Sequence, residues 1–578
     1  MSRIKYAKKM LSALIALIMV LGSFTSFVFA ESEHINLSRP DMHEEALAKI
    51  EEDVINELEK NKFTEVLVYM KDQVDTEMVA TTTKDSVSNF MTPYNTKLEV
   101  RKKVVEALKD NAIHTQSNIL DYLEQEVTKG TVEEFESYYI VNMVYVKATR
   151  EVIENIAHRW EVERIYKNRI HKLDTPVVTD GIEPSDENLE WNIERVQADK
   201  VWDLGYDGTG IVVGSLDSGV DWTHPALRDK WRGYDPVTGE IDPSKSWYDP
   251  VYRETLPSDS GIHGTHVMGT ILGQEPNGMN KIGVAPGAKW IAARVFDAWG
   301  TTTDTKLLSA AQWMLAPGGD PSAAPDVINN SWGGEAGIND WFRDAVRAWR
   351  AAGIFPVFAA GNQLPGEPLP WPGSITVPAN YPESFAVAAV DINDIRASFS
   401  KLGPSPYDPT MIKPEISAPG VSIRSSIPGG GYDVNSGTSM AAPHITGTVA
   451  LLLSTNVSLS IEDIERILTE TAEPLTDETY PESPNFGYGY GMVNCYEAVL
   501  SIASEPSYIS GKVLVEGNDN EEPIIEHEQT VSESYVGMDI EITAKVSDDI
   551  SVKEVELLVK QAGKPYWYKI PMERIDGD

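Results

Sequence analysis

Cysteine is almost absent from this chain, since Cys495 is the only one among 578 residues. A single cysteine excludes an intramolecular disulfide, so the fold depends on its hydrophobic core for stability. Cys495 stands in Val493–Leu500, which has a helical pattern and no neighbouring cation that lowers the pKa of a thiol. We therefore expect Cys495 to be a buried structural thiol and not a nucleophile.

Basic residues are scarce relative to acidic ones. The chain has 49 Lys and Arg against 88 Asp and Glu, which gives a formal net charge of −39. Nucleic-acid phosphates bind basic surfaces, so this balance excludes nucleic acid as a partner. Apolar residues make up 42% of the chain, a share that is typical of globular proteins and not of disordered ones.

Long apolar runs are missing except for one near the start, Met10–Phe29. Four basic residues precede this run, and Val28–Ala30 supplies the small residues of a cleavage site, so residues 1–30 are predicted to be a secretory signal peptide. The alternative is an uncleaved membrane anchor, which the acidic, polar segment after Ala30 disfavours. No cysteine follows the run to carry a lipid. We expect a secreted protein, extracellular or associated with the cell wall, without stable insertion in a membrane.

Changes of pattern divide the rest of the chain. Helical and strand-like stretches first predict a small α+β domain, and a segment rich in proline and acidic residues follows it. Apolar runs separated by helical stretches then predict an α/β fold, a parallel sheet flanked by helices. Alternating strands at the end resemble the start of an immunoglobulin-like or fibronectin-like sandwich, with too few strands to complete one. The predicted boundaries are 1–30 for the signal peptide, 31–175 for the α+β domain, 176–190 for the linker, 191–503 for the α/β domain and 504–578 for the partial all-β segment.

Hydrophobic periodicity predicts the individual elements. In the first domain we expect a helix over 95–127, another over 148–158, and strands at 65–70, 138–147 and 160–166. In the α/β domain we expect buried strands at 211–216, 290–296, 354–359 and 385–390, and a helix over 340–352. Near the end of the chain, strands at 535–546 and 551–560 are expected to flank a turn.

Three segments carry residues suited to nucleophilic catalysis. Asp217 ends the buried strand in Val213–Pro225, His263 opens a helix in His263–Gly269, and Ser439 lies at a helix start in Gly437–Pro443. A serine hydroxyl becomes a good nucleophile when an imidazole accepts its proton. The imidazole in turn needs a carboxylate that fixes its tautomer and stabilises the imidazolium. The N–H groups of a helix start stabilise negative charge beside the serine.

Competing motifs are missing. His263 and His266 lie on one helix face as half a metal site does, but no H-E-x-x-H pattern or third ligand accompanies them, which disfavours zinc. Ser439 is not in the G-x-S-x-G motif of esterases and lipases, which disfavours that class. The chain order Asp, His, Ser is the order found in subtilisin.

The three segments together resemble the signatures of the subtilisin family of serine proteases, or subtilases. The resemblance implies a serine endopeptidase with Asp217, His263 and Ser439 as its catalytic triad, and Asn362, in Phe358–Asn362, as the oxyanion-hole asparagine. Thr438 and the backbone N–H of Ser439 complete the hole. The family also implies protein substrates that pair as an extra strand between two chain segments. The matching substrate-binding residues are Ser331, Trp332 and Gly333 in one segment and Trp299 and Gly300 in the other.

Further expectations follow from the resemblance. Pocket walls are expected from 331–333, 359–361 and the segment near Thr376, with no acidic residue at the base. The reaction needs no cofactor. Structural calcium is plausible, but the family's metal position is Ala226 here and the loop Gln274–Asn280 departs from the usual form, so the ligands are unknown. The insertion between Asp217 and His263 is expected to be a surface loop near the substrate.

The first domain matches the inhibitor-type propeptide of subtilisin precursors. The resemblance implies that it acts as an intramolecular inhibitor and that the zymogen cuts itself between about Arg169 and Glu190. The alternative is an accessory domain that is never removed. For the whole chain, a second hypothesis is a catalytically silent fold that serves as an extracellular binding module, which an intact triad with Asn362 disfavours.

Overall fold

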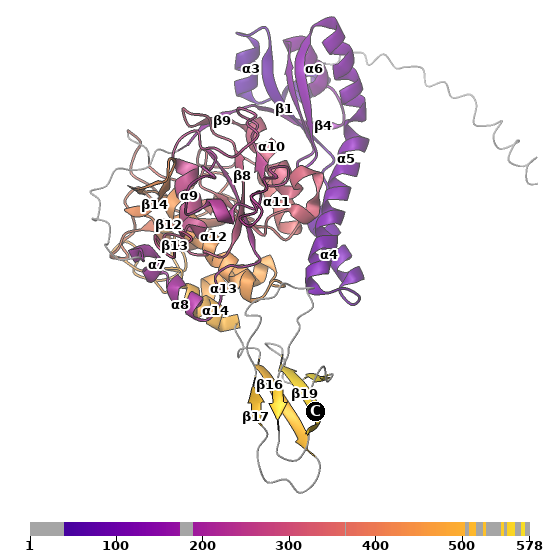
Figure 1. Ribbon diagram of the computed structural model, residues 1–578. Helices are drawn as coiled ribbons and strands as arrows, with labels where there is room; N and C mark the ends of the chain where they lie inside the picture. The colour runs from indigo at the N-terminus through magenta and orange to yellow at the C-terminus, as the bar shows by residue number, and fades with distance from the viewer. Residues whose placement is uncertain are drawn as a thin grey trace, which may run out of the picture.

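The computed structural model describes residues 40–173, 189–363 and 366–502, together with strands between 508 and 572. Residues 40–173 form what we call the N-terminal unit, and residues 189–502 form the central unit (Figure 1). The predicted signal peptide and all but the last two residues of the predicted linker lie outside the described residues. Among the described residues, no helix combines the length and the apolar character that a membrane span requires.

The N-terminal unit is an antiparallel sheet with strand order β2-β3-β1-β4, covered by helices. Val66 and Val68 of β1 pack into one cluster with α2, α3 and α6, while Leu67 between them faces a second cluster that continues into the central unit. The elements are α2 (Pro40–Leu47), α3 (Glu52–Leu58), β1 (Thr64–Met70), α4 (Thr76–Val87), α5 (Pro93–Lys129), β2 (Val132–Tyr138), β3 (Met143–Ala148), α6 (Arg150–Ala157), β4 (Val162–Lys167) and β5 (Ile170–Lys172).

The predicted strand 138–147 is wrong as a single element, because a turn at 139–142 separates β2 from β3. Buried amides stabilise this turn. Gln116 Nε2 of α5 donates to the backbone oxygen of Tyr138 at 2.9 Å and to Asn142 Oδ1 at 2.7 Å. Sequence alternation continues through the turn and gives no sign of these partners, which come from a distant helix. Helix α4, which was not predicted, begins after Asp75, whose carboxylate accepts from the N–H of Met78.

The central unit contains a seven-stranded sheet with the order β13-β12-β11-β10-β6-β8-β7, in which neighbouring strands run parallel. This confirms the α/β class. The strands are β6 (Val212–Asp217), β7 (Trp247–Tyr248), β8 (Lys289–Arg294), β10 (Val327–Asn330), β11 (Phe355–Ala359), β12 (Phe385–Val390) and β13 (Ile416–Pro419). Outside this sheet lie β9 (Thr301–Thr303), which pairs with β5, and the hairpin of β14 (Ile423–Ile427) and β15 (Gly431–Asn435).

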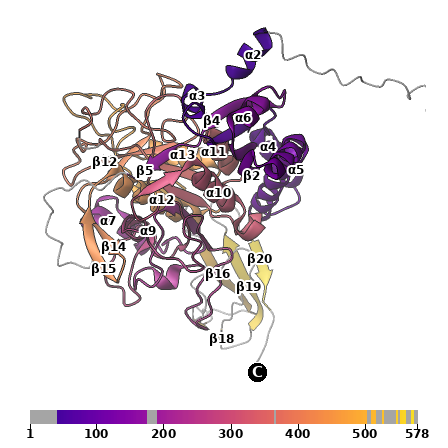
Figure 2. The same ribbon diagram turned by 90° about the horizontal axis from the view of Figure 1, so that it is seen from above.

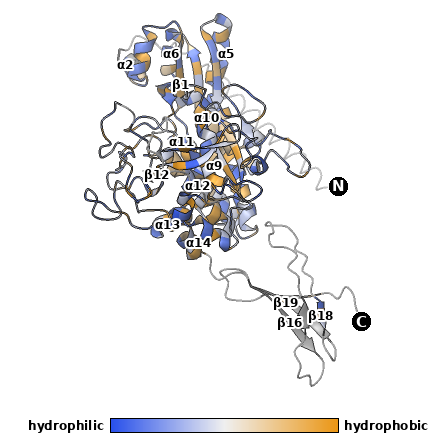
Figure 3. Cartoon of the chain, turned by 60° about the vertical axis from the view of Figure 1, so that its left-hand side comes forward, coloured by the Kyte–Doolittle hydropathy of each residue, from blue (hydrophilic) through white to orange (hydrophobic). Residues whose placement is uncertain are grey.

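Helices cover both faces of this sheet. They are α7 (Trp191–Arg195), α8 (Ala198–Asp203), α9 (His263–Leu272), α10 (Asp304–Leu315), α11 (Arg343–Ala351), α12 (Thr438–Thr455), α13 (Ile461–Glu470) and α14 (Cys495–Ile502). Successive strand residues face opposite sides, so Val327 packs with α9 and α12 whereas Ile328 packs with α10 and α11. Apolar stretches therefore gather in the middle of the central unit and polar ones at its periphery (Figure 3).

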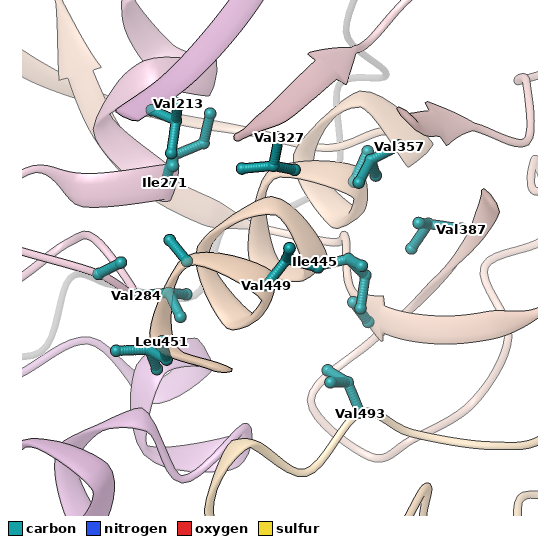
Figure 4. Close-up of a cluster of buried hydrophobic side chains, with 14 of the residues drawn as sticks. Val213, Ile271, Val284, Val327, Val357, Val387, Ile445, Val449, Leu451 and Val493 are labelled. Carbon is teal, nitrogen blue, oxygen red and sulfur yellow. The ribbon is translucent and has the colours of Figure 1, made fainter. Parts of the chain in front are cut away.

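Helix α12 runs through the core and is buried over most of its length. Its residues Ile445 and Val449 lie among valines of four neighbouring strands, and Figure 4 labels these as Val213, Val327, Val357 and Val387. Such a helix is apolar on all sides because every side meets protein. Its buried position fixes where its first residues, including Ser439, stand relative to the sheet.

The N-terminal unit packs on the central unit through the cluster that contains α10 and α11. Figures 1 and 2 show α4 and α5 lying beside α11. Polar contacts border the apolar ones: Tyr69 of β1 donates its hydroxyl to Asp344 of α11, and Lys97 of α5 pairs with Asp326 at 2.7 Å. The two units therefore share a continuous interface.

The insertion between Asp217 and His263 was predicted to be a surface loop, but part of it is buried. Trp231 is completely buried and stacks on Trp290 of β8, with ring centroids 5.9 Å apart. Trp247 lies in β7, which extends the sheet beyond β8. The insertion thus closes one edge of the sheet, and its tryptophans supply the apolar area that keeps it there.

The described strands near the end of the chain form two small sheets. The first has the order β16-β19-β20, from β16 (Tyr508–Val515), β19 (Val552–Lys560) and β20 (Tyr568–Pro571), and the second pairs β17 (Ile524–Glu526) with β18 (Lys545–Ser547). The predicted strand 551–560 corresponds to β19, which pairs with β16, whereas most of the predicted strand 535–546 lies outside the described residues. The strand that pairs with β19 therefore lies much earlier in the sequence than the segment next to it.

Candidate active site

A carboxylate and an imidazole form a buried pair at the C-terminal edge of the central sheet. Strand β6 ends at Asp217 and helix α9 begins at His263, as predicted, and His263 Nδ1 lies 2.8 Å from Asp217 Oδ1. Both side chains are buried. A carboxylate accepts hydrogen bonds, so Nδ1 is the protonated nitrogen and the lone pair of the neutral ring lies on Nε2. The pair is arranged for a histidine that takes up a proton at Nε2.

The start of α9 can approach β6 only because residue 264 is glycine. A Cβ at this position would lie 2.1 Å from the backbone oxygen of Gly219 and 3.1 Å from Asp217 Cβ. The N–H of Gly264 also donates to Ser218 Oγ at 2.9 Å. These contacts dock the first turn of α9 against the strand end and so orient His263.

Ser439 is the second residue of α12 and lies at the same edge of the sheet. Its hydroxyl donates to the backbone oxygen of Ser331 at 3.2 Å, and Ser331 Oγ donates to the backbone oxygen of Ser439 at 2.9 Å. Ser331 directly follows β10, the neighbour of β6. Helices α9 and α12 pack closely, since a Cβ on Gly447 of α12 would lie 3.0 Å from the backbone oxygen of Ile271 of α9. His263 and Ser439 therefore open two adjacent helices.

The amide of Asn362 is held in one orientation beside Ser439. The backbone N–H and the hydroxyl of Thr438 each lie 2.9 Å from Asn362 Oδ1. A backbone N–H can only donate, so the atom that it meets is the amide oxygen. Asn362 Nδ2 then lies on the side of Ser439. A Cβ added to Gly437 would be 3.5 Å from Nδ2 and 3.6 Å from the backbone N of Ser439. Both nitrogens therefore border the same space beside Ser439.

The predicted pocket walls come together around Thr376. A Cβ on Gly333 would lie 2.5 Å from Thr376 Oγ1, and one on Gly361 would lie 2.8 Å from the same atom. Both positions therefore let the Thr376 side chain approach this closely only because they are glycines. Trp332, by contrast, is buried against Phe342 and Phe358, so it is a packing residue.

Residues 170–173 lie as an added strand beside the site. Strand β5 pairs antiparallel with β9, with His171 opposite Thr302, and the N–H of Leu173 donates to the backbone oxygen of Gly300 at 2.7 Å. The segment predicted to pair with substrate, 297–300, contributes Gly300 to this pairing. This segment is a turn whose N–H groups bond to Asp297 Oδ1, and Trp299 is 78% exposed. The remaining partners of β5 lie in 301–303.

Two residues beside β5 were missed by the sequence analysis. Asp304, the first residue of α10, lies 2.5 Å from His171 Nε2, and Trp341 stacks on the His171 ring. An acidic residue at a helix start is normally interpreted as a favourable charge for the helix dipole. The contact of Asp304 with His171 becomes visible only once β5 is paired with β9.

The other histidines of the motifs have structural partners. His266 Nε2 lies 3.0 Å from the backbone oxygen of Ile423, and His444 Nδ1 lies 2.9 Å from that of Met440. Burial lowers the pKa of each imidazole to about 4. Cys495 is buried beside Thr448, and burial raises the pKa of its thiol to about 12, which confirms a structural thiol.

Stability of the central unit is expected to fall as the pH drops from about 6.5 to about 4. In the unfolded chain a histidine has a pKa near 6.5, whereas folded His266 and His444 titrate at about 4. Between these values the unfolded state binds the protons and the folded state does not, so the stabilisation present above pH 6.5 is lost on acidification. Each histidine accounts for about 3 kcal/mol.

The measurement is the melting temperature against pH in a Ser439→Ala background, which prevents self-digestion. His444→Gln keeps a neutral donor and should flatten the curve between pH 6.5 and 4. His114→Gln, at an exposed position of α5, is the matched control. Equal slopes for the two variants would contradict the assignment.

The two places where the family often holds calcium offer few free acidic oxygens in this chain. Ala226 is buried and offers no carboxylate. Glu275, the acidic residue of Gln274–Asn280, accepts hydrogen bonds at Oε1 from Tyr432 and from Asn280. Among the residues that the structure describes, no group of three acidic, histidine or cysteine side chains could hold a metal. A hard cation needs six or more oxygens, so structural calcium stays a prediction without assigned ligands.

An Asp–His pair, a serine at a helix start and an oriented asparagine, in this chain order on a parallel sheet, define a subtilisin-type serine endopeptidase. The chain belongs to the subtilase family, whose model (Peptidase S8) matches residues 208–491. The family resemblance read from the sequence is thereby confirmed.

Two relatives show how far the similarity extends. Bacillopeptidase F of Bacillus subtilis (strain 168) is 46% identical over 548 residues, which are 92% of this chain and 38% of that protein. Subtilisin DY of Bacillus licheniformis is 34% identical over 308 residues, which are 53% of this chain and 97% of that protein. The chain thus spans well under half of the first relative and nearly all of the second.

Proposed function

We propose that this chain is the precursor of a secreted serine endopeptidase that cuts proteins through Ser439. The observation that carries the proposal is the buried Asp217–His263 pair at the sheet edge where Ser439 and Asn362 also lie. Secretion is inferred from the signal peptide predicted over 1–30. The reaction needs no cofactor, because side chains and backbone groups of the chain supply every role.

In the proposed mechanism Ser439 Oγ attacks the carbonyl carbon of the scissile bond while His263 Nε2 takes its proton. Asp217 holds the other proton at Nδ1 and stabilises the imidazolium. The negative oxygen of the tetrahedral intermediate accepts from Asn362 Nδ2 and the N–H of Ser439. His263 then gives its proton to the leaving amine, and water releases the acyl-enzyme by the same steps.

A fluorophosphonate probe and casein digestion test this function together. An active serine hydrolase reacts with the probe at Ser439, and only a protease also digests casein. Labelling without casein digestion would support an esterase, and no labelling would support a silent binding module.

Replacing Asn362 by alanine is expected to lower kcat about 10²–10³-fold, with little change in KM, a magnitude taken from a subtilisin. The amide donor acts on the negative oxygen that forms only in the intermediate, so substrate binding is nearly unaffected. Thr438→Ser, which keeps the hydroxyl that orients Asn362, is the control and should stay near the parent rate. Full activity of Asn362→Ala would move the oxyanion hole elsewhere.

We further propose that residues 31–175 are an inhibitory propeptide. The pairing of β5 with β9 supports this, because it runs a segment of the chain along the edge where a substrate would pair. The interface with α10 and α11 supports tight docking of the whole unit. After cleavage the propeptide stays bound as an inhibitor until it is removed.

The precursor is expected to cut itself after Leu173 and before Trp191, giving a mature enzyme that begins shortly before Trp191. Residues up to Leu173 are held by β9 and Gly300, so the bond that reaches Ser439 follows them. The Ser439→Ala chain, expressed without other proteases, should remain uncut while the parent is cut. Mass spectrometry of both decides the point, and cutting of the variant at the same bond would mean that another protease does the work.

A further inference from the structure

A buried carboxylate faces the side chain of the added strand. Asp304 is fully buried at the start of α10, directly after β9. Its Oδ1 lies 2.5 Å from His171 Nε2, and its Oδ2 accepts from the backbone N–H of Arg169 at 2.9 Å. Both donors to the carboxylate therefore come from the segment that lies in the cleft.

A flat aromatic wall completes the pocket. The rings of His171 and Trp341 are stacked, with centroids 5.6 Å apart and planes 18° from parallel. On another side, a Cβ on Gly334 would lie 3.4 Å from His171 Nδ1. His171, Trp341 and Gly334 line a groove of about 1060 Å³. Its shape suits a planar group that can donate to a carboxylate.

The register relates this pocket to the catalytic residues. Strand β5 runs from Thr303 toward Thr301, and Leu173 reaches Gly300. Further back along the same chain, the N–H of Val295 donates to the backbone oxygen of Asp217. The segment thus runs toward the Asp217 end of the sheet, and His171 lies upstream of any bond presented to Ser439.

We propose that Asp304 and Trp341 form a specificity subsite that selects a planar cationic side chain, His or Arg, at the substrate position opposite Thr302. This inference rests on the proposed peptidase function, and His171 is the side chain by which the precursor occupies the subsite. A guanidinium stacks on an indole and pairs with a carboxylate, so Arg fits both walls. An apolar side chain would exclude water from Asp304 without offering a donor, which is costly, and a carboxylate would repel it.

The test uses peptides with the sequence of residues 166–178 that differ only at position 171, cleaved by enzyme produced from the full chain. The expected order of kcat/KM is His and Arg above Gln, then Leu, with Glu lowest, and a ratio of about 10–100 between Arg and Leu. These peptides need no enzyme variant, so the result does not depend on whether a variant folds.

Asp304→Asn should then compress the ratio between the Arg and Leu peptides to within about threefold. Asp340→Asn is the matched control, because Asp340 lines the same groove but pairs with Arg343 and not with His171. Equal rates for all peptides, or a ratio that survives Asp304→Asn, would overturn the subsite and leave the peptidase function standing. No cleavage of any peptide or of casein would overturn both.

Discussion

Replacing Ser439 by alanine is expected to abolish proteolysis while the fold stays intact. The substitution removes the nucleophile and one hydrogen bond, to the backbone oxygen of Ser331, and leaves helix α12 otherwise unchanged. We expect turnover to fall about 10⁶-fold, the magnitude known for the nucleophile of a subtilisin. His263→Ala should cost about as much, and the double variant hardly more, because the two residues act as one unit.

The measurement is casein digestion by purified protein, with circular dichroism to verify folding. Ser454→Ala is a matched control on the same helix, since Ser454 Oγ only donates to the backbone oxygen of Leu451. This control should retain full activity and full labelling by a fluorophosphonate. More than trace digestion by Ser439→Ala would contradict the assignment of the nucleophile.

The elements that carry the three predicted catalytic residues could be predicted from local sequence. Asp217 follows a buried apolar run, and His263 and Ser439 each stand before a run of small and apolar residues. Such signals need no knowledge of distant partners, because strand ends and helix starts are set by their own neighbours in the chain. The strand end and the two helix starts were therefore predicted to the residue or within one.

Features that depend on distant pairing were not predictable in this way. The partner of β9 is β5, more than a hundred residues earlier in the chain, so the sequence alone placed the substrate strand at 297–300. The same limit applies to Trp231, whose burial depends on Trp290, and to Asp304, whose role depends on His171. A polar residue shows its function only when the groups that face it are known.

Arg101 of α5 joins the N-terminal unit to the central unit. Its side chain is 3% exposed and donates to the backbone oxygens of Ala352, Ala324 and Pro325, at 2.9–3.1 Å. It also lies 3.2 Å from Asp326 Oδ1. Burial alone raises the pKa of Asp326, but the charges of Lys97 and Arg101 outweigh this and hold that pKa below its ordinary value. Arg101 of the N-terminal unit thus stabilises the negative charge of Asp326 in the central unit.

Arg101→Met in the precursor is expected to release the propeptide about 10²–10³-fold more readily once the linker is cut. The variant leaves several buried acceptors without their donor, and breaking a buried pair in this way costs about 3–5 kcal/mol. The consequence is a shorter lag between cleavage, followed by gel electrophoresis, and full activity on a fluorogenic peptide. Lys103→Met is the matched control on the same helix, because its ion pair with Glu106 is exposed to solvent and contributes little to stability. If Arg101→Met and Lys103→Met both showed the lag of the parent, docking through Arg101 would not govern inhibition. The pairing of β5 with β9 would then have to hold the propeptide in the cleft by itself.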